Sequence, residues 1–215
     1  MSNTGPTVPG RPAASAVGAA GLGPAGAVGG ERRARPNGWW GMAVFVATEA
    51  TLFGTLVGTY FYLRFKSAEW PPFGIAPPAV AVPLILTGVL VATSLPIQLA
   101  LRSARSERVV AARWLLLLAL VVQAGYLAMQ IQLFTDDLAK FTAQGSAYGS
   151  IYFTLLGAHH CHVFAGMLLE AFLLLRLLGG ITNYRLVGLQ STAFYVHFVN
   201  TLALVVVATQ LSAAA

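Results

Sequence analysis

ARWLLLLALVVQAGYLAMQIQLF, residues 112–134, is the stretch that decides the fold of this chain. It is almost uninterruptedly apolar, and a helix of about 20 apolar residues crosses a hydrocarbon core of roughly 30 Å. The whole chain has the same character, since 57% of its 215 residues are hydrophobic and 9% are charged. Soluble domains carry roughly a quarter charged residues. The composition therefore predicts an integral membrane protein.

Further apolar stretches of similar length lie on both sides of this one. We place five predicted spans at about 39–63, 79–101, 112–134, 149–175 and 188–211. Pro83 and Pro96 fall inside the second, where neighbouring helices can satisfy the carbonyls that proline frees, so a kinked span is favoured over a re-entrant segment. The predicted fold class is all-α, an integral membrane bundle of five transmembrane helices within residues 37–215.

Residues 1–36 differ in composition from everything that follows. They are rich in Ala, Gly and Pro, end in several arginines and show no hydrophobic periodicity, which is typical of a disordered basic tail. Because acidic residues are nearly absent, an organelle transit peptide is the alternative. We favour a cytoplasmic tail.

The placement of Lys and Arg predicts the orientation of the bundle. Of the 13 basic residues, ten fall on the side of the N-terminus: Arg11, Arg32, Arg33, Arg35, Arg102, Arg105, Arg108, Arg113, Arg176 and Arg185. The remaining three, Arg64, Lys66 and Lys140, fall on the opposite side. The positive-inside rule therefore predicts a cytoplasmic N-terminus and an outer C-terminus. Because these charges lie between hydrophobic segments, the net charge of +6 does not point to nucleic acid.

Glu49 lies near the middle of the first predicted span, where an acidic side chain costs on the order of 3 kcal/mol. It is either a hydrogen-bonded structural carboxyl or a site for proton exchange, lipid or a partner subunit. Gly54 and Gly58 form a pair of small residues suited to close helix packing. On a helix, Glu49 points about 140° from Gly54 and about 180° from Gly58. We therefore expect Glu49 to face a second interface or a cleft between groups of helices.

Polar residues share one face in each of the later spans. In the fourth span the stripe also includes one glycine, and it consists of Tyr148, Tyr152, His159, His162, Gly166 and Glu170. The matching faces are formed by Thr87, Ser94 and Gln98 in the second span, by Gln123, Tyr126 and Gln130 in the third, and by Gln190, His197, Asn200 and Thr201 in the fifth. We expect the helices to meet along polar seams, with hydrogen-bonded histidines and Glu170 as a candidate partner for them.

Three histidines close together raise the question of a metal or haem site. His159 and His162 are one helical turn apart and could reach one ion, but His160 points about 100° away from His159. A haem protein would usually place opposed histidines on separate helices. The chain has no Walker loop, nucleophile elbow or zinc-ligand spacing. We expect no catalytic residue, no metal ligand and no cofactor bound by this chain itself.

Five motifs give the sequence a resemblance to a known family. They are Trp40-Gly41-Met42 with Ala47 through Phe53 around Glu49, Trp70-Pro71-Pro72, Tyr148-Gly149-Ser150, Gly157 through Val163 with Gly166, and Tyr195 through Asn200. In this order they resemble subunit III of haem–copper oxidases, the cytochrome c oxidase subunit III family, over about residues 39–211. Five-span bacterial members of that family lack the first two helices of the seven-span form, so the resemblance implies a bacterial cell membrane.

The resemblance implies a subunit without redox centres of its own. Haem and copper would belong to partner subunits I and II of an aa3-type cytochrome c oxidase, which couples oxygen reduction to proton pumping. This chain would pack on subunit I, hold phospholipid in a cleft, support proton uptake and limit inactivation during turnover. Glu49 would match the family's membrane-embedded carboxylate beside the lipid cleft. His159, His162 and His197 would hold the helix group together.

Two positions depart from the family pattern. Asn200 stands where the family has an acidic residue after the histidine of the last span, and Gln130 stands where it has a glutamate. These departures suggest a divergent branch, so the alternatives are an accessory subunit of a quinol oxidase or of a nitric oxide reductase. A proton-coupled transporter using Glu49 or Glu170 is a remote alternative, against which the odd number of spans and the lack of a repeat weigh.

Overall fold

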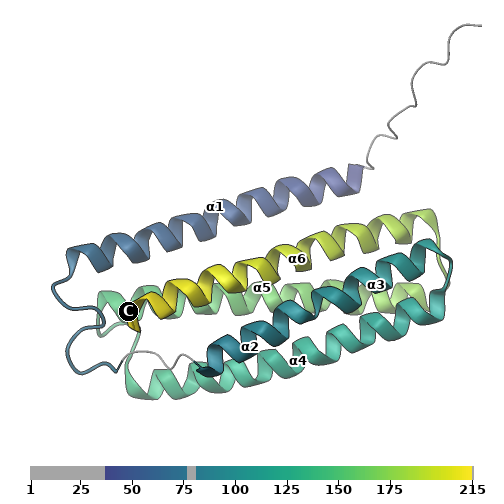
Figure 1. Ribbon diagram of the computed structural model, residues 1–215. Coiled ribbons are helices and arrows are strands. Elements are labelled where there is room, and N and C mark those ends of the chain that lie inside the picture. The colour runs from purple at the N-terminus through teal and green to yellow at the C-terminus, as the bar shows by residue number, and fades with distance from the viewer. Residues whose placement is uncertain (1–36, 77–80, 215) are drawn as a thin grey trace, which may run out of the picture. The chain divides into compact units, whose positions relative to one another are not determined.

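The computed structural model describes residues 37–76 and 81–214, and within these ranges the chain is helical, without strands. The long helices are α1 (Asn37–Lys66), α2 (Ala81–Ala92), α3 (Ser94–Arg105), α4 (Val109–Lys140), α5 (Ala147–Leu177) and α6 (Asn183–Leu211). A short 3-10 helix, η1 (Ser212–Ala214), follows α6 (Figure 1). The disordered tail predicted for residues 1–36 lies outside the described residues.

Five helical segments are long and apolar enough to cross a membrane, which confirms the predicted fold class. They are α1, the run Ala81–Arg105 that contains α2 and α3, and the helices α4, α5 and α6. Most begin or end several residues outside the predicted apolar stretches. The 32 residues of α4 rise about 48 Å against a hydrocarbon core of roughly 30 Å. The extra turns at the ends of this helix therefore reach the polar interfaces.

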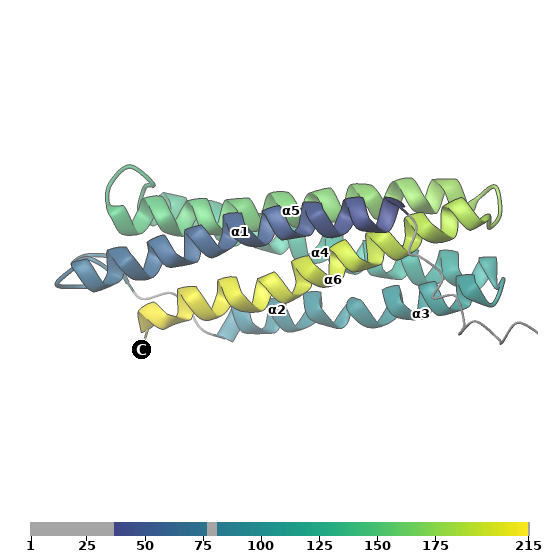
Figure 2. The same ribbon diagram turned by 90° about the horizontal axis from the view of Figure 1, so that it is seen from above.

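The second span is interrupted at Thr93 rather than divided into separate segments. Pro96 has no backbone N–H, so it cannot bond to the carbonyl of Ala92, and α2 ends at that residue. The Thr93 hydroxyl donates to the carbonyl of Leu90 at 2.6 Å, and the helix resumes at Ser94. Figure 2 shows α3 continuing the course of α2. The run from Ala81 to Arg105 is long and apolar enough to form one span. This agrees with the prediction of a single kinked span that contains two prolines.

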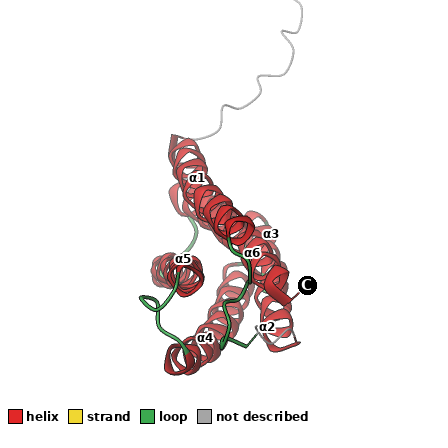
Figure 3. Cartoon of the chain, turned by 90° about the vertical axis from the view of Figure 1, so that its left-hand side faces the viewer, coloured by secondary structure: helices red, strands yellow, loops and turns green. Residues whose placement is uncertain are grey.

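Helix α6 is the central element of the bundle. It contacts α1, α2, α3 and α5, whereas α4 contacts α2, α3 and α5. Helix α1 contacts only α5 and α6 among the long helices, and Figure 3 shows it beside α6 at the edge of the bundle. This arrangement brings one side of α1 against α5 and α6 and leaves most of its remaining surface uncovered.

The distribution of polar and apolar side chains is that of a membrane protein. Large apolar side chains are exposed on the outside, including Val44, Leu118 and Leu168 at 64%, 53% and 56%. Polar side chains such as Gln123 and Glu170 are buried between helices instead. Exposed apolar residues match lipid, while buried polar groups require partners within the bundle. The sites described below are built from those buried and half-buried polar groups.

Candidate functional site

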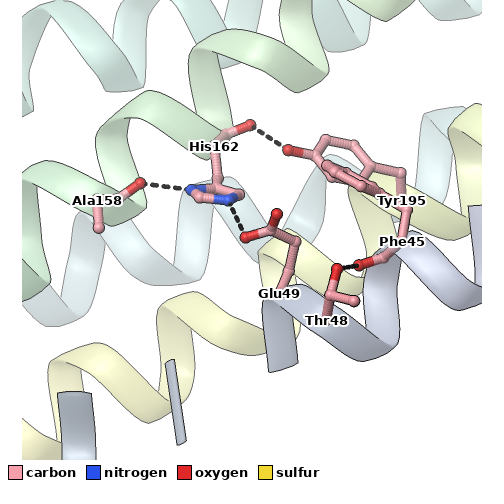
Figure 4. Close-up of polar contacts among 6 residues, drawn as sticks. All are labelled: Phe45, Thr48, Glu49, Ala158, His162 and Tyr195. Carbon is pink, nitrogen blue, oxygen red and sulfur yellow. Dashed lines mark hydrogen bonds and ion pairs between the residues drawn. The ribbon is translucent and has the colours of Figure 1, made fainter. Parts of the chain in front are cut away.

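Glu49 of α1 and His162 of α5 form a direct contact between two spans. Glu49 Oε2 lies 2.7 Å from His162 Nε2 (Figure 4). The only other acid–base contact among the described residues, between Asp137 and Lys140, lies within α4. The side chains of Glu49 and His162 are 18% and 17% exposed, so the pair lies near the edge of the bundle rather than in its core.

The second ring nitrogen of His162 fixes how many protons the pair holds. His162 Nδ1 lies 2.7 Å from the carbonyl oxygen of Ala158. A carbonyl oxygen only accepts hydrogen bonds, so Nδ1 carries a proton and donates it. Nε2 then accepts from a protonated Glu49 or, as part of an imidazolium, donates to the carboxylate. In both states the two side chains share one proton and their charges sum to zero, which avoids an isolated charge within the membrane.

Neighbouring aromatic side chains hold the imidazole in position. The ring of Phe53, one turn after Glu49 on α1, meets the His162 ring edge-on with centroids 5.1 Å apart. From α6, the Tyr195 hydroxyl donates to the backbone carbonyl of His162 at 3.2 Å. Gly166 lies beside this contact, and a Cβ at that position would lie 3.5 Å from the Tyr195 ring, which is ordinary van der Waals distance. The pair is thus held by three helices.

The expected close packing of Gly54 and Gly58 does not occur between helices in the described part of the chain. A Cβ added at either glycine would meet nothing within 4 Å. Helical spacing shows which residues share a face but not which faces another helix of the same chain covers. Glu49 does point away from both glycines, toward α5.

Half of the polar stripe on α5, namely Tyr152, His159 and Glu170, bonds to α4. Glu170 Oε1 accepts from Gln123 Nε2 at 2.9 Å, so Glu170 pairs with a glutamine and not with a histidine. His159 Nε2 lies 3.4 Å from the Tyr126 hydroxyl, which also accepts from Gln130 Nε2 at 3.3 Å. The stripe therefore divides among several neighbours, since His162 reaches α1 and Gly166 lies beside Tyr195 of α6.

Asn200 lies at a different junction, between α6 and the interruption of the second span. Its Nδ2 donates to Thr93 Oγ1 at 3.2 Å and to Ser94 Oγ at 2.8 Å. An asparagine amide can donate to both hydroxyls, which an ionised carboxylate cannot do. The asparagine therefore bonds both hydroxyls without a charge, while its buried Oδ1 has no hydrogen-bond partner among the described residues.

The remaining histidines have separate surroundings. His160 is buried and meets the ring of Phe134 with centroids 5.9 Å apart. His197 is half-buried and lines a groove between α3 and α6. Within residues 37–76 and 81–214, no three His, Cys, Asp or Glu side chains converge to hold a metal ion.

Several contacts in the structure were not predicted from the sequence. Tyr195 belongs to a recognised motif, but its hydrogen bond to His162 depends on how α5 and α6 cross. The Tyr152 hydroxyl donates to Asp137 Oδ2 at 2.8 Å and ties the C-terminal end of α4 to the N-terminal end of α5. Tyr152 lies on the predicted stripe, which is the signal that could have found this link.

The fold and the paired residues define a multi-pass helical membrane protein whose spans are joined by polar contacts. The sequence profile of cytochrome c oxidase subunit III matches residues 30–210. The chain belongs to the cytochrome c oxidase subunit III family.

Individual relatives agree with this family. The chain is 30% identical over 168 residues to cytochrome c oxidase subunit 3 of Pisaster ochraceus, an alignment that covers 75% of this chain and 64% of the relative. It is 29% identical over 171 residues to the protein of the same name from Struthio camelus, covering 76% and 64% of the two chains. The chain thus matches a little under two thirds of the length of these relatives.

Proposed function

We propose that this chain is a non-catalytic subunit of a respiratory terminal oxidase, a cytochrome c oxidase of the aa3 type. Membership of the subunit III family over residues 30–210 is the observation that carries the proposal. The proposed complex reduces oxygen and couples this reaction to proton pumping. In it the chain packs on subunit I, within the cell membrane of a bacterium.

The proposed redox centres belong to the partners. Haem and copper are assigned to subunits I and II, because the described histidines point to different neighbours rather than to one ion. His162 pairs with Glu49, His159 lies against Tyr126, and His160 meets Phe134. The chain itself contributes packing surface, hydrogen-bonded polar seams and phospholipid contacts.

The Glu49 and His162 pair is the proposed working element of the subunit. It is half-buried where α1 meets α5, so both side chains remain accessible from the surface of the bundle. A pair that shares one proton and carries no net charge can sit beside the acyl region of a phospholipid without the cost of a bare carboxylate. We propose that it borders a lipid-filled cleft and thereby supports proton uptake and the durability of the complex.

Two alternative complexes would use the same subunit fold. Asn200 and Gln130 replace acidic residues that are usual in the family, which keeps a quinol oxidase and a nitric oxide reductase as alternatives. A proton-coupled transporter is a third, remote alternative. In the structure Glu49 and Glu170 contact different helices, α5 and α4, and have no hydrogen bond to each other.

Purification through an affinity tag on this chain tests the proposal. We expect haem–copper subunits I and II to co-purify, and the complex to consume oxygen with reduced cytochrome c as donor. Oxygen consumption with quinol alone, or nitric oxide consumption, would replace the proposed partner by one of the alternatives. Co-purification of no redox subunit, together with proton flux by the chain alone in vesicles, would overturn the oxidase assignment.

A further inference from the structure

A second polar feature lies on the flank of α6 away from the Glu49 pair. Helices α1 and α3 both contact α6 but not each other, so they border a groove that has α6 as its floor. A cavity of about 310 Å³ occupies this groove. Its polar lining comes from Gln98 and Arg105 of α3 and from Gln190 and His197 of α6. Trp39 and Phe194 add an aromatic wall, with ring centroids 5.7 Å apart.

The polar side chains of the groove are left for an occupant. In the described part of the chain, Gln98, Gln190 and His197 make no side-chain hydrogen bond, and Arg105 makes neither a hydrogen bond nor an ion pair. Polar groups at membrane depth that lack partners are costly. Each of these side chains can donate a hydrogen bond, so the groove suits a ligand that is rich in acceptors.

The donors are arranged at two depths. Gln98 and Arg105 are about two turns apart on α3, and Gln190 and His197 are equally spaced on α6, which separates the two levels by about 10 Å. Arg105 is the last residue of α3, beside the loop to α4. Gln190 is next to Ser191, whose hydroxyl donates to the carbonyl of Gly38 at the start of α1 at 3.4 Å. The charged level is therefore at the membrane surface, and Gln98 and His197 lie deeper.

We propose that this groove binds the head group and glycerol region of an anionic phospholipid. The phosphodiester oxygens pair with Arg105, and the ester carbonyl oxygens accept from the deeper Gln98 and His197. These oxygens are acceptors that match the donors of the groove. No Asp or Glu lines the cavity, so its only formal charge is the positive charge of Arg105. Basic pockets between transmembrane helices on the cytoplasmic side are typical sites for anionic lipid head groups.

The apolar surface of α3 provides the path for the acyl chains. Leu95 and Leu99 lie on α3 close to Gln98 in the sequence, and they are 66% and 38% exposed. This site is separate from the proposed cleft at Glu49, which faces α5. It requires only that the chain is inserted in a membrane, so it does not depend on the oxidase assignment.

Quenching of Trp39 fluorescence by brominated lipid tests the site. The chain has four tryptophans, and replacing Trp40, Trp70 and Trp114 with Phe leaves Trp39 as the reporter. The full chain is reconstituted in vesicles of equal parts phosphatidylglycerol and phosphatidylcholine, with bromine on the acyl chains of one lipid at a time. Arg105→Gln removes the proposed head-group contact. Arg102→Gln is the matched control, because Arg102 is exposed on the same helix and does not line the cavity.

We expect brominated phosphatidylglycerol to occupy the groove with a roughly fivefold preference over brominated phosphatidylcholine, the size expected for one arginine at a membrane surface. Arg105→Gln should abolish the preference and Arg102→Gln should keep it, with helical circular dichroism unchanged in both. Equal quenching by the two lipids would overturn the proposal, and so would a preference that survives Arg105→Gln or disappears equally in Arg102→Gln. The same measurement on the purified complex would overturn it if neither lipid quenched Trp39, because a partner chain would then fill the groove.

Discussion

His162 Nε2 lies 2.7 Å from Glu49 Oε2 although 113 residues separate them in the chain. The contact joins the first span to the fourth, and the bond from His162 Nδ1 to Ala158 leaves a single proton for the two side chains to share. A neutral pair at the edge of a helical bundle is suited to a position beside lipid.

Replacing Glu49 with Ala should shorten the working life of the proposed complex without removing its haem. The substitution leaves His162 Nε2 without a partner at the bundle edge, where it would disturb the neighbouring lipid. We expect intact haem spectra, less phospholipid per haem and fewer turnovers before inactivation. Glu49→Gln should lie closer to the unsubstituted protein, because its amide can donate to His162 Nε2.

The matched control for this experiment is Glu69→Ala, which removes an exposed carboxyl from the loop after α1. Phosphorus analysis and oxygen-electrode traces provide the two readouts. If Glu49→Ala and Glu69→Ala behaved alike in both, the pair would have no part in lipid retention or durability.

Gln123→Leu should destabilise the contact between α4 and α5. Glu170 Oε2 already lacks a hydrogen-bond partner among the described residues, and the substitution would remove the bond to Oε1 as well. We expect a loss of about 1 kcal/mol in unfolding free energy. The double variant Gln123→Leu with Glu170→Leu should recover part of it, because no buried acceptor is then left alone.

A double-mutant cycle in unfolding free energy measures this coupling. Gln132→Leu serves as control, since Gln132 is exposed on the same helix. Additive effects of the two substitutions would show that the bond between Gln123 and Glu170 contributes no stability.

Gly149→Ala should be among the most damaging small substitutions in the chain. A Cβ at Gly149 would collide with the backbone carbonyl of Thr142, in the loop that leads into α5. The Ser146 hydroxyl accepts from the Gly149 N–H at 3.0 Å as the cap of the same helix, so the backbone cannot easily move away. We expect a cost of about 1–3 kcal/mol in unfolding free energy.

Gly166→Ala is the natural comparison for that measurement. Its added Cβ would make only ordinary contact with Tyr195 and Val196. Since alanine favours helices over glycine by about 1 kcal/mol, the melting temperature should stay level or rise. A fall as large as that of Gly149→Ala would refute this explanation of the two glycines.

Arg113→Gln should loosen the C-terminal end of α5. Arg113 Nε and Nη2 donate to the carbonyl of Leu177, the last residue of the helix, at 3.0 and 2.6 Å. The same carbonyl also accepts from the backbone N–H of Gly180 at 3.0 Å. Loss of this charged cap should lower the unfolding free energy by about 2 kcal/mol. Arg108→Gln is the control, because Arg108 is exposed and makes no side-chain cap bond. Equal stability of the two variants would contradict the role of Arg113.

The membrane spans could be predicted from the sequence because length and apolarity suffice to define them. For residues 112–134, the free-energy cost of exposing an apolar helix to water is enough to favour a membrane span. The helix ends were less predictable, since α4 continues to Lys140 through the charged residues Asp136 and Asp137. Hydrophobicity carries no signal for turns that extend into the membrane interface.

The candidate site could be predicted only in part. Periodicity placed Gln123, His159 and Glu170 on facing stripes, yet it could not show that Glu170 bonds to Gln123 rather than to a histidine. The pairing of Glu49 with His162 depends on the packing of α1 against α5, and no local pattern encodes which spans are neighbours. The uncovered face of Gly54 and Gly58 depends on the same information.

Turnover-dependent inactivation of the proposed oxidase, measured with and without this chain, tests the central claim most directly. Oxygen consumption is followed to exhaustion for the purified complex, for the complex depleted of the chain, and after the chain is added back. The account predicts the same initial rate per haem in all three, an early decay in the depleted complex, and a lifetime restored by addition. Identical decay curves, or loss of haem on depletion, would contradict a non-catalytic supporting subunit.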